Sequence, residues 1–203
     1  MVDLSLVKPN NLWYIIGLIV TDGNLANDGR HINITSKDTG FLEEIRKSLS
    51  IKNKITIKSR DKEKEKKYYF LQFGDIKFYK FLTKIGLTAK KSLTLKEIEV
   101  PQQYFVDFLR GIIDGDGSIS SWVHNTNGNI QWSLRIISAA PIFVNWLKKE
   151  IEDYFNVKGK IYGYKHKDKK NFLYIIKFGK FAAKVVLKKC YYRNCLSLNR
   201  KFD

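Results

Sequence analysis

The fold is decided by two short stretches, Gly17-Leu-Ile-Val-Thr-Asp22-Gly23 and Gly111-Ile-Ile-Asp-Gly-Asp116-Gly117. Each has a glycine within a largely apolar segment and ends in Asp-Gly. A helix that is apolar on almost every side must be buried, and the other copy is its simplest partner. Gly17 and Gly111 would let the two backbones approach closely, although glycine costs about 1 kcal/mol in helix propensity. The sequence therefore predicts two motif helices packed together at a central interface.

The correspondence between the two stretches continues along the chain in the same order. Ile34-Thr-Ser36 matches Ile136-Ile-Ser138, Phe41–Ile45 matches Phe143–Leu147, Phe73-Gly74 matches Phe178-Gly179, and Ser92–Leu95 matches Cys195–Leu198. The spacing between matched residues is 94 at the aspartates and 102 at Phe41, so an insertion is expected around residues 124–131, where Asn127-Gly128 is typical of a hairpin turn. A doubled sequence predicts a doubled structure with an axis through its middle.

Within each half the pattern predicts helix, two strands, helix, two strands, helix, which is an α+β fold of two pseudo-symmetric αββαββα repeats. In the first half we expect helix Asn11–Thr21, strands Asn24–Leu25 and His31–Thr35, helix Thr39–Leu49, strands Lys54–Ser59 and Tyr68–Phe73, and helix Lys77–Ile85. Lys90–Val100 is the predicted linker, and Pro101 opens the second copy because proline suits the first turn of a helix. The expected repeats are residues 1–96 and 97–203.

The charge of the chain predicts a polyanionic partner. Its 203 residues include 37 Lys and Arg against 20 Asp and Glu, a formal net charge of +17. Such a field attracts nucleic acid, although a solvated basic surface or an anionic membrane surface would also accommodate it. The apolar run Trp13–Val20 is too short to cross a bilayer and the N-terminus lacks a signal-peptide pattern, so we expect a soluble, intracellular protein without a membrane partner.

The two Asp-Gly pairs indicate a metal held by oxygen. Cys190 and Cys195 lack the spacing of a zinc or redox motif, and the three histidines are scattered. Asp22 and Asp116 should emerge side by side, where their like charges and the helix dipoles disfavour them. A divalent ion such as Mg²⁺ removes this conflict and suits phosphodiester hydrolysis. One such pair alone would be better interpreted as a turn, in which the glycine allows a left-handed exit from the helix.

Residues Ile15–Gly23 and Leu109–Gly117 resemble the two copies of the LAGLIDADG motif, and Phe108–Ser118 is a very close match by itself. Through the repeat order, the resemblance to the single-chain, two-motif form of the LAGLIDADG homing endonuclease family extends over nearly the whole chain. The first copy departs from the motif at Val20, where an acid is often found and where the second copy has Asp114.

The resemblance implies a site-specific endonuclease that cuts both strands of a long pseudo-palindromic DNA across a compressed minor groove, leaving short 3′ overhangs. It implies that Asp22 and Asp116 bind the catalytic metal. The expected ion is Mg²⁺, for which Mn²⁺ can substitute, and Ca²⁺ is expected to support binding without cleavage. The family also places basic or amide groups around the metals. Lys91 is the candidate for this role and Lys90 the alternative, whereas the second half offers Asn194 or Arg193, so the two active sites are expected to differ.

Alternation along the predicted strands indicates which side chains meet DNA. Two antiparallel sheets should form a saddle whose concave faces lie in the major groove on either side of the cut. The candidate DNA-binding residues are Asn33, Thr35, Lys54, Thr56, Lys58 and Arg60 in the first half and Gln131, Ser133, Arg135, Lys158, Lys160, Tyr162 and Tyr164 in the second. Ile55 and Ile57 should face inward, and some of the lysines should touch phosphates without specifying sequence.

Two other functions use the same fold. An RNA-splicing maturase would apply the basic surface to an intron RNA without needing both aspartates, and a DNA-binding regulator would lack catalysis. The presence of Asp22 and Asp116 favours the endonuclease, with double-stranded DNA as partner. Since one chain supplies both halves of the symmetric interface, we expect a monomer.

Overall fold

The structure is a computed structural model that describes residues 2–58, 68–89, 91–165 and 172–198. The first half contains α1 (Pro9–Thr21), β1 (Gly23–Leu25), β2 (His31–Ser36), α2 (Thr39–Ser48), β3 (Ile55–Lys58), β4 (Tyr68–Gly74) and α3 (Ile76–Lys84). The second contains α5 (Phe105–Asp116), β5 (Gly117–Val123), β6 (Ile130–Ser138), α6 (Pro141–Phe155), β7 (Lys160–Lys165), β8 (Phe172–Phe178) and α7 (Lys180–Cys190). The prediction of an α+β fold with two αββαββα repeats is confirmed.

The segment between the halves carries structure of its own. A short helix, α4 (Lys91–Thr94), lies within the predicted linker, and a single 3-10 turn, Gln102–Tyr104, follows Pro101 before α5 begins. Pro101 is therefore the cap of this turn and lies four residues before the motif helix. The first motif helix starts at Pro9, earlier than predicted, because proline lacks an N–H and fits the first helical turn.

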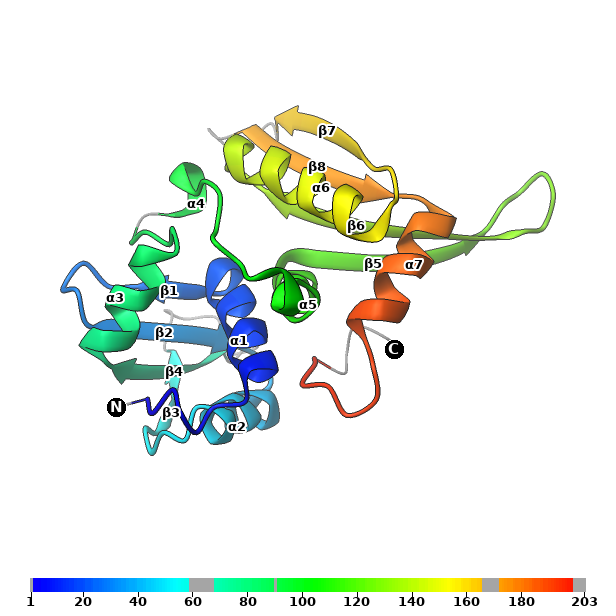
Figure 1. Ribbon diagram of the computed structural model, residues 1–203. Helices are drawn as coiled ribbons and strands as arrows, with labels where there is room; N and C mark the ends of the chain where they lie inside the picture. The colour runs from blue at the N-terminus through cyan, green and yellow to red at the C-terminus, as the bar shows by residue number, and fades with distance from the viewer. Residues whose placement is uncertain (1, 59–67, 90, 166–171, 199–203) are drawn as a thin grey trace.

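The motif helices α1 and α5 cross at the centre of the molecule, where two glycines bring their backbones together (Figure 1). A methyl group on Gly17 would lie 2.2 Å from the carbonyl oxygen of Phe108, and one on Gly111 would lie 2.1 Å from that of Tyr14. Both distances are far shorter than any carbon-to-oxygen contact, so any larger residue would push the helices apart. These two positions set the separation of the two halves.

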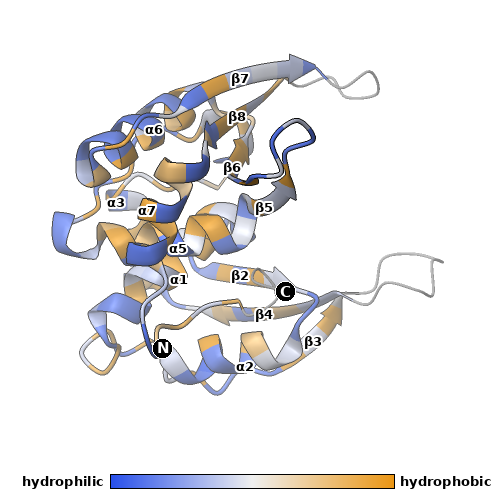
Figure 2. Cartoon of the chain, turned by 90° about the vertical axis from the view of Figure 1, so that its right-hand side faces the viewer, coloured by the Kyte–Doolittle hydropathy of each residue, from blue (hydrophilic) through white to orange (hydrophobic). Residues whose placement is uncertain are grey.

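Each half builds a four-stranded antiparallel sheet, in the order β1-β2-β4-β3 and β5-β6-β8-β7. Helices α2 and α6 each pack against the sheet of their own half, and α1 and α5 lie between the halves (Figure 2). On β2, buried Ile32 and Ile34 alternate with half-buried Asn33 and Thr35. One face of each sheet is thus packed against helices, while the other carries polar side chains interspersed with apolar ones such as Phe70 and Ile175.

The segment after α7 is held against α5 by a buried carboxylate. Asp114 is fully buried and accepts hydrogen bonds from the Tyr14 hydroxyl at 2.7 Å, the Tyr191 hydroxyl at 2.6 Å and the Leu198 backbone N–H at 2.8 Å. Burial, reinforced by the charge of Asp114, raises the pKa of both tyrosines, so both hydroxyls keep their protons and donate. The acid that the first motif lacks at Val20 therefore anchors the C-terminal segment in the second.

None of the helices in the described part of the chain is long and apolar enough to cross a membrane.

The protein is expected to be a monomer in solution. Fusion of the two repeats already buries each motif helix against the other, so no second chain is needed to cover them. Light scattering should give the mass of one chain, 23.7 kDa. A mass of twice that value at micromolar concentration would contradict the expectation.

Candidate active site and DNA-binding surface

The C-terminal ends of the two motif helices each present an exposed aspartate. Asp22 is the C-cap of α1 and Asp116 is the last residue of α5. The glycine after each aspartate is buried. A methyl group on Gly23 would lie 2.6 Å from the Ile19 Cα, and one on Gly117 would lie 2.5 Å from the Ile113 carbonyl oxygen. The predicted left-handed exit is wrong, because Gly117 has φ −83° in extended backbone. Glycine is required because the chain folds back tightly against the preceding helical turn.

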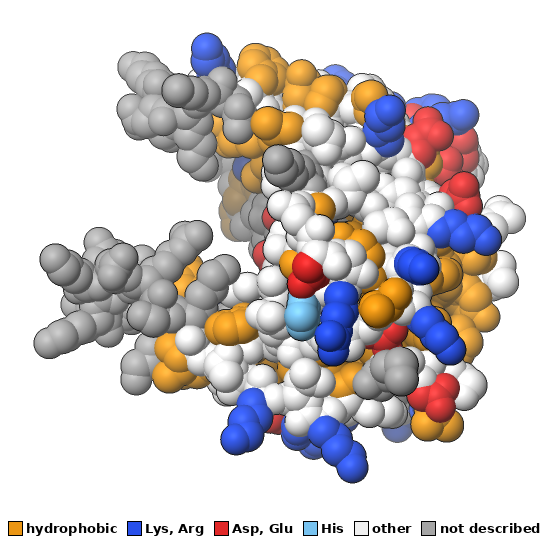
Figure 3. Space-filling model, turned by 90° about the vertical axis from the view of Figure 1, so that its left-hand side faces the viewer, with side chains coloured by type: hydrophobic (Ala, Val, Ile, Leu, Met, Phe, Trp, Pro, Cys, Tyr) orange, Lys and Arg blue, Asp and Glu red, His pale blue; other side chains and the backbone are white. Residues whose placement is uncertain are grey.

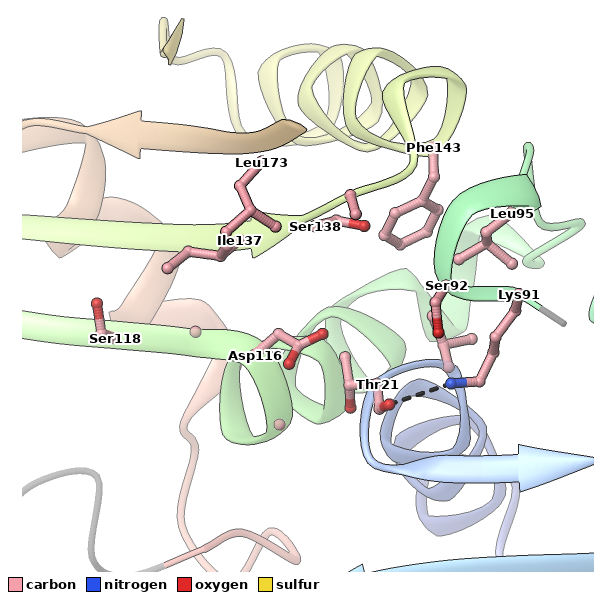
Figure 4. A pocket seen from close by; sticks show the side chains of 14 residues that line it. Thr21, Lys91, Ser92, Leu95, Asp116, Ser118, Ile137, Ser138, Phe143 and Leu173 are labelled. Carbon is pink, nitrogen blue, oxygen red and sulfur yellow. Dashed lines mark hydrogen bonds between the residues drawn. The ribbon is translucent and has the colours of Figure 1, made fainter. Parts of the chain in front are cut away.

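A buried lysine lies next to both aspartates. Lys91 is the first residue of α4, is 9% exposed, and its Nζ donates a hydrogen bond to the Thr21 carbonyl oxygen at 3.1 Å (Figure 4). Burial lowers the pKa of its amine, while the negative charges of Asp116 and Asp22 act in the opposite direction. The two carboxylates and the amine therefore form one electrostatically linked group. The alternative, Lys90, lies outside the described residues.

In the described part of the second half, neither candidate counterpart of this lysine lines the cleft. Arg193 and Asn194 are both exposed in the segment that follows α7, and Asn194 has the left-handed φ of 62°. Among the described residues that line the cleft beside Asp116, Lys91 is the one cation. The candidate active site is thus chemically asymmetric.

A cleft of about 560 Å³ opens beside this group. Thr21, Lys91 and Ser92 line it from the first half, and Asp116, Ser118, Ile137, Ser138 and Phe143 line it from the second (Figure 4). In the close-up, the carboxylate of Asp116 points into the cleft toward Ser92 and Lys91. The cleft joins the ends of the motif helices to the open face of the second sheet.

The donor atoms fit a hard divalent ion. No group of three or more His, Cys, Asp or Glu side chains gathers in the described part of the chain, which excludes there a metal cage built from those side chains alone. Mg²⁺ does not need one, because it commonly takes one or two carboxylates and fills its remaining positions with water and substrate phosphate. Asp22 and Asp116 offer that type of site.

The register places the candidate DNA-binding residues of the second half on one face of its sheet. Arg135 is the Cα partner of Lys177, which partners Lys160, and Tyr162 partners Ile175, which partners Ile137. Gln131 and Tyr164 follow by alternation, and Lys158 is exposed just before β7. The space-filling view shows the molecule hollowed between its two halves (Figure 3).

Ser133 is an exception to the predicted set. It lies on the open side of β6 but is fully buried, and its hydroxyl accepts a hydrogen bond from the Arg135 Nε at 3.3 Å. The expectation that Ser133 meets DNA directly is wrong, because alternation identifies a face of a strand but not what covers it. Ser133 instead positions the guanidinium of Arg135.

The first sheet presents a similar face with two differences from expectation. Thr35, Phe70 and Thr56 are Cα partners across three strands, and exposed Lys54 precedes β3. Ile57, predicted to face inward, is 56% exposed, since it pairs with Tyr69 toward the end of the short strand β3 and not with a buried residue such as Leu71. Lys58 ends β3, and Arg60 lies outside the described residues.

Sequence reasoning missed several residues on these faces. Asn24 and Gln72 join Asn33 in the first half, and Ser118 and Lys177 join Arg135 in the second. Gln72 could have been found, because it lies between buried Leu71 and Phe73 in a strand that was predicted. Asn24 could not be identified, because its three-residue strand is too short to show an alternation of polar and apolar residues.

Comparisons with known proteins agree with this architecture. The LAGLIDADG-like domain model matches residues 9–86. No curated protein sequence matches the chain significantly. The homing endonuclease I-WcaI bound to its DNA recognition sequence has a TM-score of 0.63 and 16% identity, over 96% of this chain and 85% of that one.

Two further solved structures share the fold. I-DmoI in complex with DNA and Mn matches with a TM-score of 0.56 and 17% identity, over 91% of this chain and 98% of that one. Full-length DUF199/WhiA from Thermatoga maritima matches with a TM-score of 0.58 and 19% identity, over 92% of this chain. The chain spans 57% of the length of that WhiA protein. Residues 9–86 thus match the LAGLIDADG-like domain model, and the second half of the chain repeats the strand order of the first, β5-β6-β8-β7 for β1-β2-β4-β3.

Proposed function

We propose that the protein is a metal-dependent, site-specific DNA endonuclease that hydrolyses one phosphodiester on each strand of a long, pseudo-palindromic site and leaves short 3′ overhangs. One observation carries the proposal. Two exposed aspartates, at adjacent helix ends, share a buried lysine at a cleft that opens onto the polar face of a sheet. A protein that only binds nucleic acid does not need this cluster of two carboxylates and a buried amine.

Each part of the site has a chemical task. Asp22 and Asp116 would hold Mg²⁺, which when bound acidifies water and withdraws charge from phosphate oxygens. The Lys91 ammonium, fixed by its hydrogen bond to the Thr21 carbonyl, is positioned to donate to a phosphate oxygen on which negative charge develops. Its burial strengthens that interaction because little water screens it.

Binding is a separate task that falls to the two sheets. Their open faces carry amide, hydroxyl, guanidinium and ammonium groups suited to base edges and phosphates. The net charge of +17 would draw DNA to the protein and make its affinity strongly dependent on salt. The fold alone does not distinguish a nuclease from a regulator or a maturase.

The decisive experiment is selection of cleaved sites from a randomised DNA library in Mg²⁺, with Mn²⁺ and Ca²⁺ in parallel. We expect one family of sites to be cut on both strands in Mg²⁺ and Mn²⁺, and to be bound but left intact in Ca²⁺. A library site that is bound but never cut in any of these ions would indicate a regulator. No DNA site at all, with tight binding to an intron RNA, would indicate a maturase.

Replacing Lys91 with Met is expected to slow cleavage about a hundredfold or more while specific binding in Ca²⁺ persists, because a donor to the developing phosphate charge is lost. Single-turnover cleavage and a gel-shift titration measure the two effects. Lys96→Met removes an exposed ammonium from the same segment and should cleave normally. Equal rates for the Lys91 and Lys96 variants would remove Lys91 from the active site.

A further inference from the structure

The open faces of the two sheets carry matching rows of side chains next to the active site. In the second half the row crosses all four strands: Ser118, Arg135, Lys177 and Lys160 are successive Cα partners. In the first half the matching row is Asn24, Asn33 and Gln72. Each row begins two residues after an active-site aspartate. We call them the second inner row and the first inner row.

The repeat puts these residues at equivalent places. Both rows begin on the first strand of their sheet, which follows the motif helix directly, and then cross the second strand and the strand beside it. Ser118 also lines the cleft with Asp116, so the second inner row adjoins the site of chemistry. Bound DNA would therefore meet the two rows at equal distances on either side of the cut.

The chemistry of the two rows differs. The first offers amides at Asn24, Asn33 and Gln72, with Gln72 and Asn24 exposed and Asn33 half-buried, and among the described residues its one cation is exposed Lys54, which precedes β3. The second offers three cations on adjacent strands. Like charges directly opposite each other destabilise a sheet, so the second row is matched to a ligand rich in acceptor atoms. Lys160 and Lys177 line a hollow of about 270 Å³, which leaves space for such a ligand.

Arg135 is held in place for base recognition. Its Nε donates to the fully buried Ser133 hydroxyl, so the donors left for a ligand are those of the two terminal nitrogens. That edge of a guanidinium pairs with guanine O6 and N7 in the major groove, and a lysine ammonium reaches the same two atoms. The amides of Asn33 and Gln72 instead match adenine, which offers an acceptor at N7 and a donor at N6.

We propose that the protein reads its two half-sites with different chemistry: guanine opposite Arg135 and Lys177 on one side of the cut, and adenine opposite Asn33 and Gln72 at the equivalent positions on the other. The inference rests on the proposed binding of DNA. It adds which bases the two inner rows select.

The test is selection of bound sites from a randomised library in Ca²⁺, with the full chain and two exchange variants. Arg135→Gln with Lys177→Gln gives the second half an amide row and should change the selected guanines to adenines on one side only. Asn33→Arg with Gln72→Lys gives the first half a cationic row and should change the selected adenines to guanines on the other side only. Each exchange should shift the relative affinity for guanine and adenine about tenfold or more at its base pairs. The matched control, Lys149→Gln with Lys188→Gln, removes two exposed cations from helices and should leave both half-sites unchanged.

The outcomes separate this inference from the function on which it rests. Enrichment of no DNA site by the unaltered protein would defeat the proposed function itself. A selected site whose inner base pairs are alike on both sides would overturn the inference alone. So would exchange variants that lose affinity for every sequence equally, since the cations would then contact only phosphates. Circular dichroism melts establish that both exchange variants are folded. As an internal control, each variant should keep the original base preference in the half-site that its substitutions do not face.

Discussion

Asp22→Asn and Asp116→Asn are each expected to slow DNA cleavage about a thousandfold while leaving specific binding in Ca²⁺ nearly unchanged. The carboxylate holds a cation that withdraws charge from the reacting phosphate, so its loss acts on the transition state. Affinity arises elsewhere, from contacts spread over both sheets and from the net charge of +17. Asparagine keeps the size of the side chain, and both positions are exposed, so folding should not change.

Single-turnover cleavage of the selected site and a gel-shift titration in Ca²⁺ measure the two effects separately. Asp153→Asn, an exposed aspartate on α6 away from the cleft, is the matched control and should cleave normally. If each aspartate serves mainly one strand, either variant should convert supercoiled plasmid to open circles without linearising it. Wild-type cleavage by both variants would mean that these aspartates are only turn residues.

The fold could be predicted because the sequence contains an internal repeat. A match at one Asp-Gly pair says little, but its recurrence at Asp116 with the same downstream order fixes two copies of a single topology. The motif helices follow from the same repeat, since Gly17 and Gly111 make sense only where two backbones touch. Lys91 was selected by its place in the repeat, and the structure brings it beside both acids.

What could not be predicted depends on contacts between distant segments. The second motif helix was expected to be almost wholly apolar, yet Asp107, Arg110 and Asp114 are all buried within α5. Their partners come mainly from residues 190–198, some 77 to 86 positions later. No local sequence pattern indicates which carbonyl or hydroxyl group will form a hydrogen bond with a buried charged side chain. The same limit explains Ser133, whose burial depends on what lies over the strand.

Arg110→Met is expected to destabilise the folded protein by about 3 to 5 kcal/mol, because it removes one partner of a fully buried ion pair. The guanidinium is 0% exposed, bonds Asp107 at 2.8 Å, and donates to the carbonyl oxygens of Leu196 at 2.8 Å and Cys190 at 2.9 Å. The rings of Tyr14 and Tyr192 each lie 5.0 Å from its central carbon. Methionine fills much of this space but leaves the Asp107 carboxylate uncompensated and two carbonyls without their donor.

Urea unfolding measures the change in the free energy of unfolding, with Arg46→Met as the matched control. Arg46 pairs with Glu43 at 2.6 Å on the partly exposed surface of α2, and its loss should cost less than about 1 kcal/mol. Adding Asp107→Asn to Arg110→Met should recover part of the loss, since the unpaired charge is then removed as well. Because Arg110 fastens residues 190–196 to a motif helix, the single variant should also loosen that segment and raise hydrogen exchange there. If Arg110→Met costs no more than Arg46→Met, the buried pair does not hold the C-terminal segment in place.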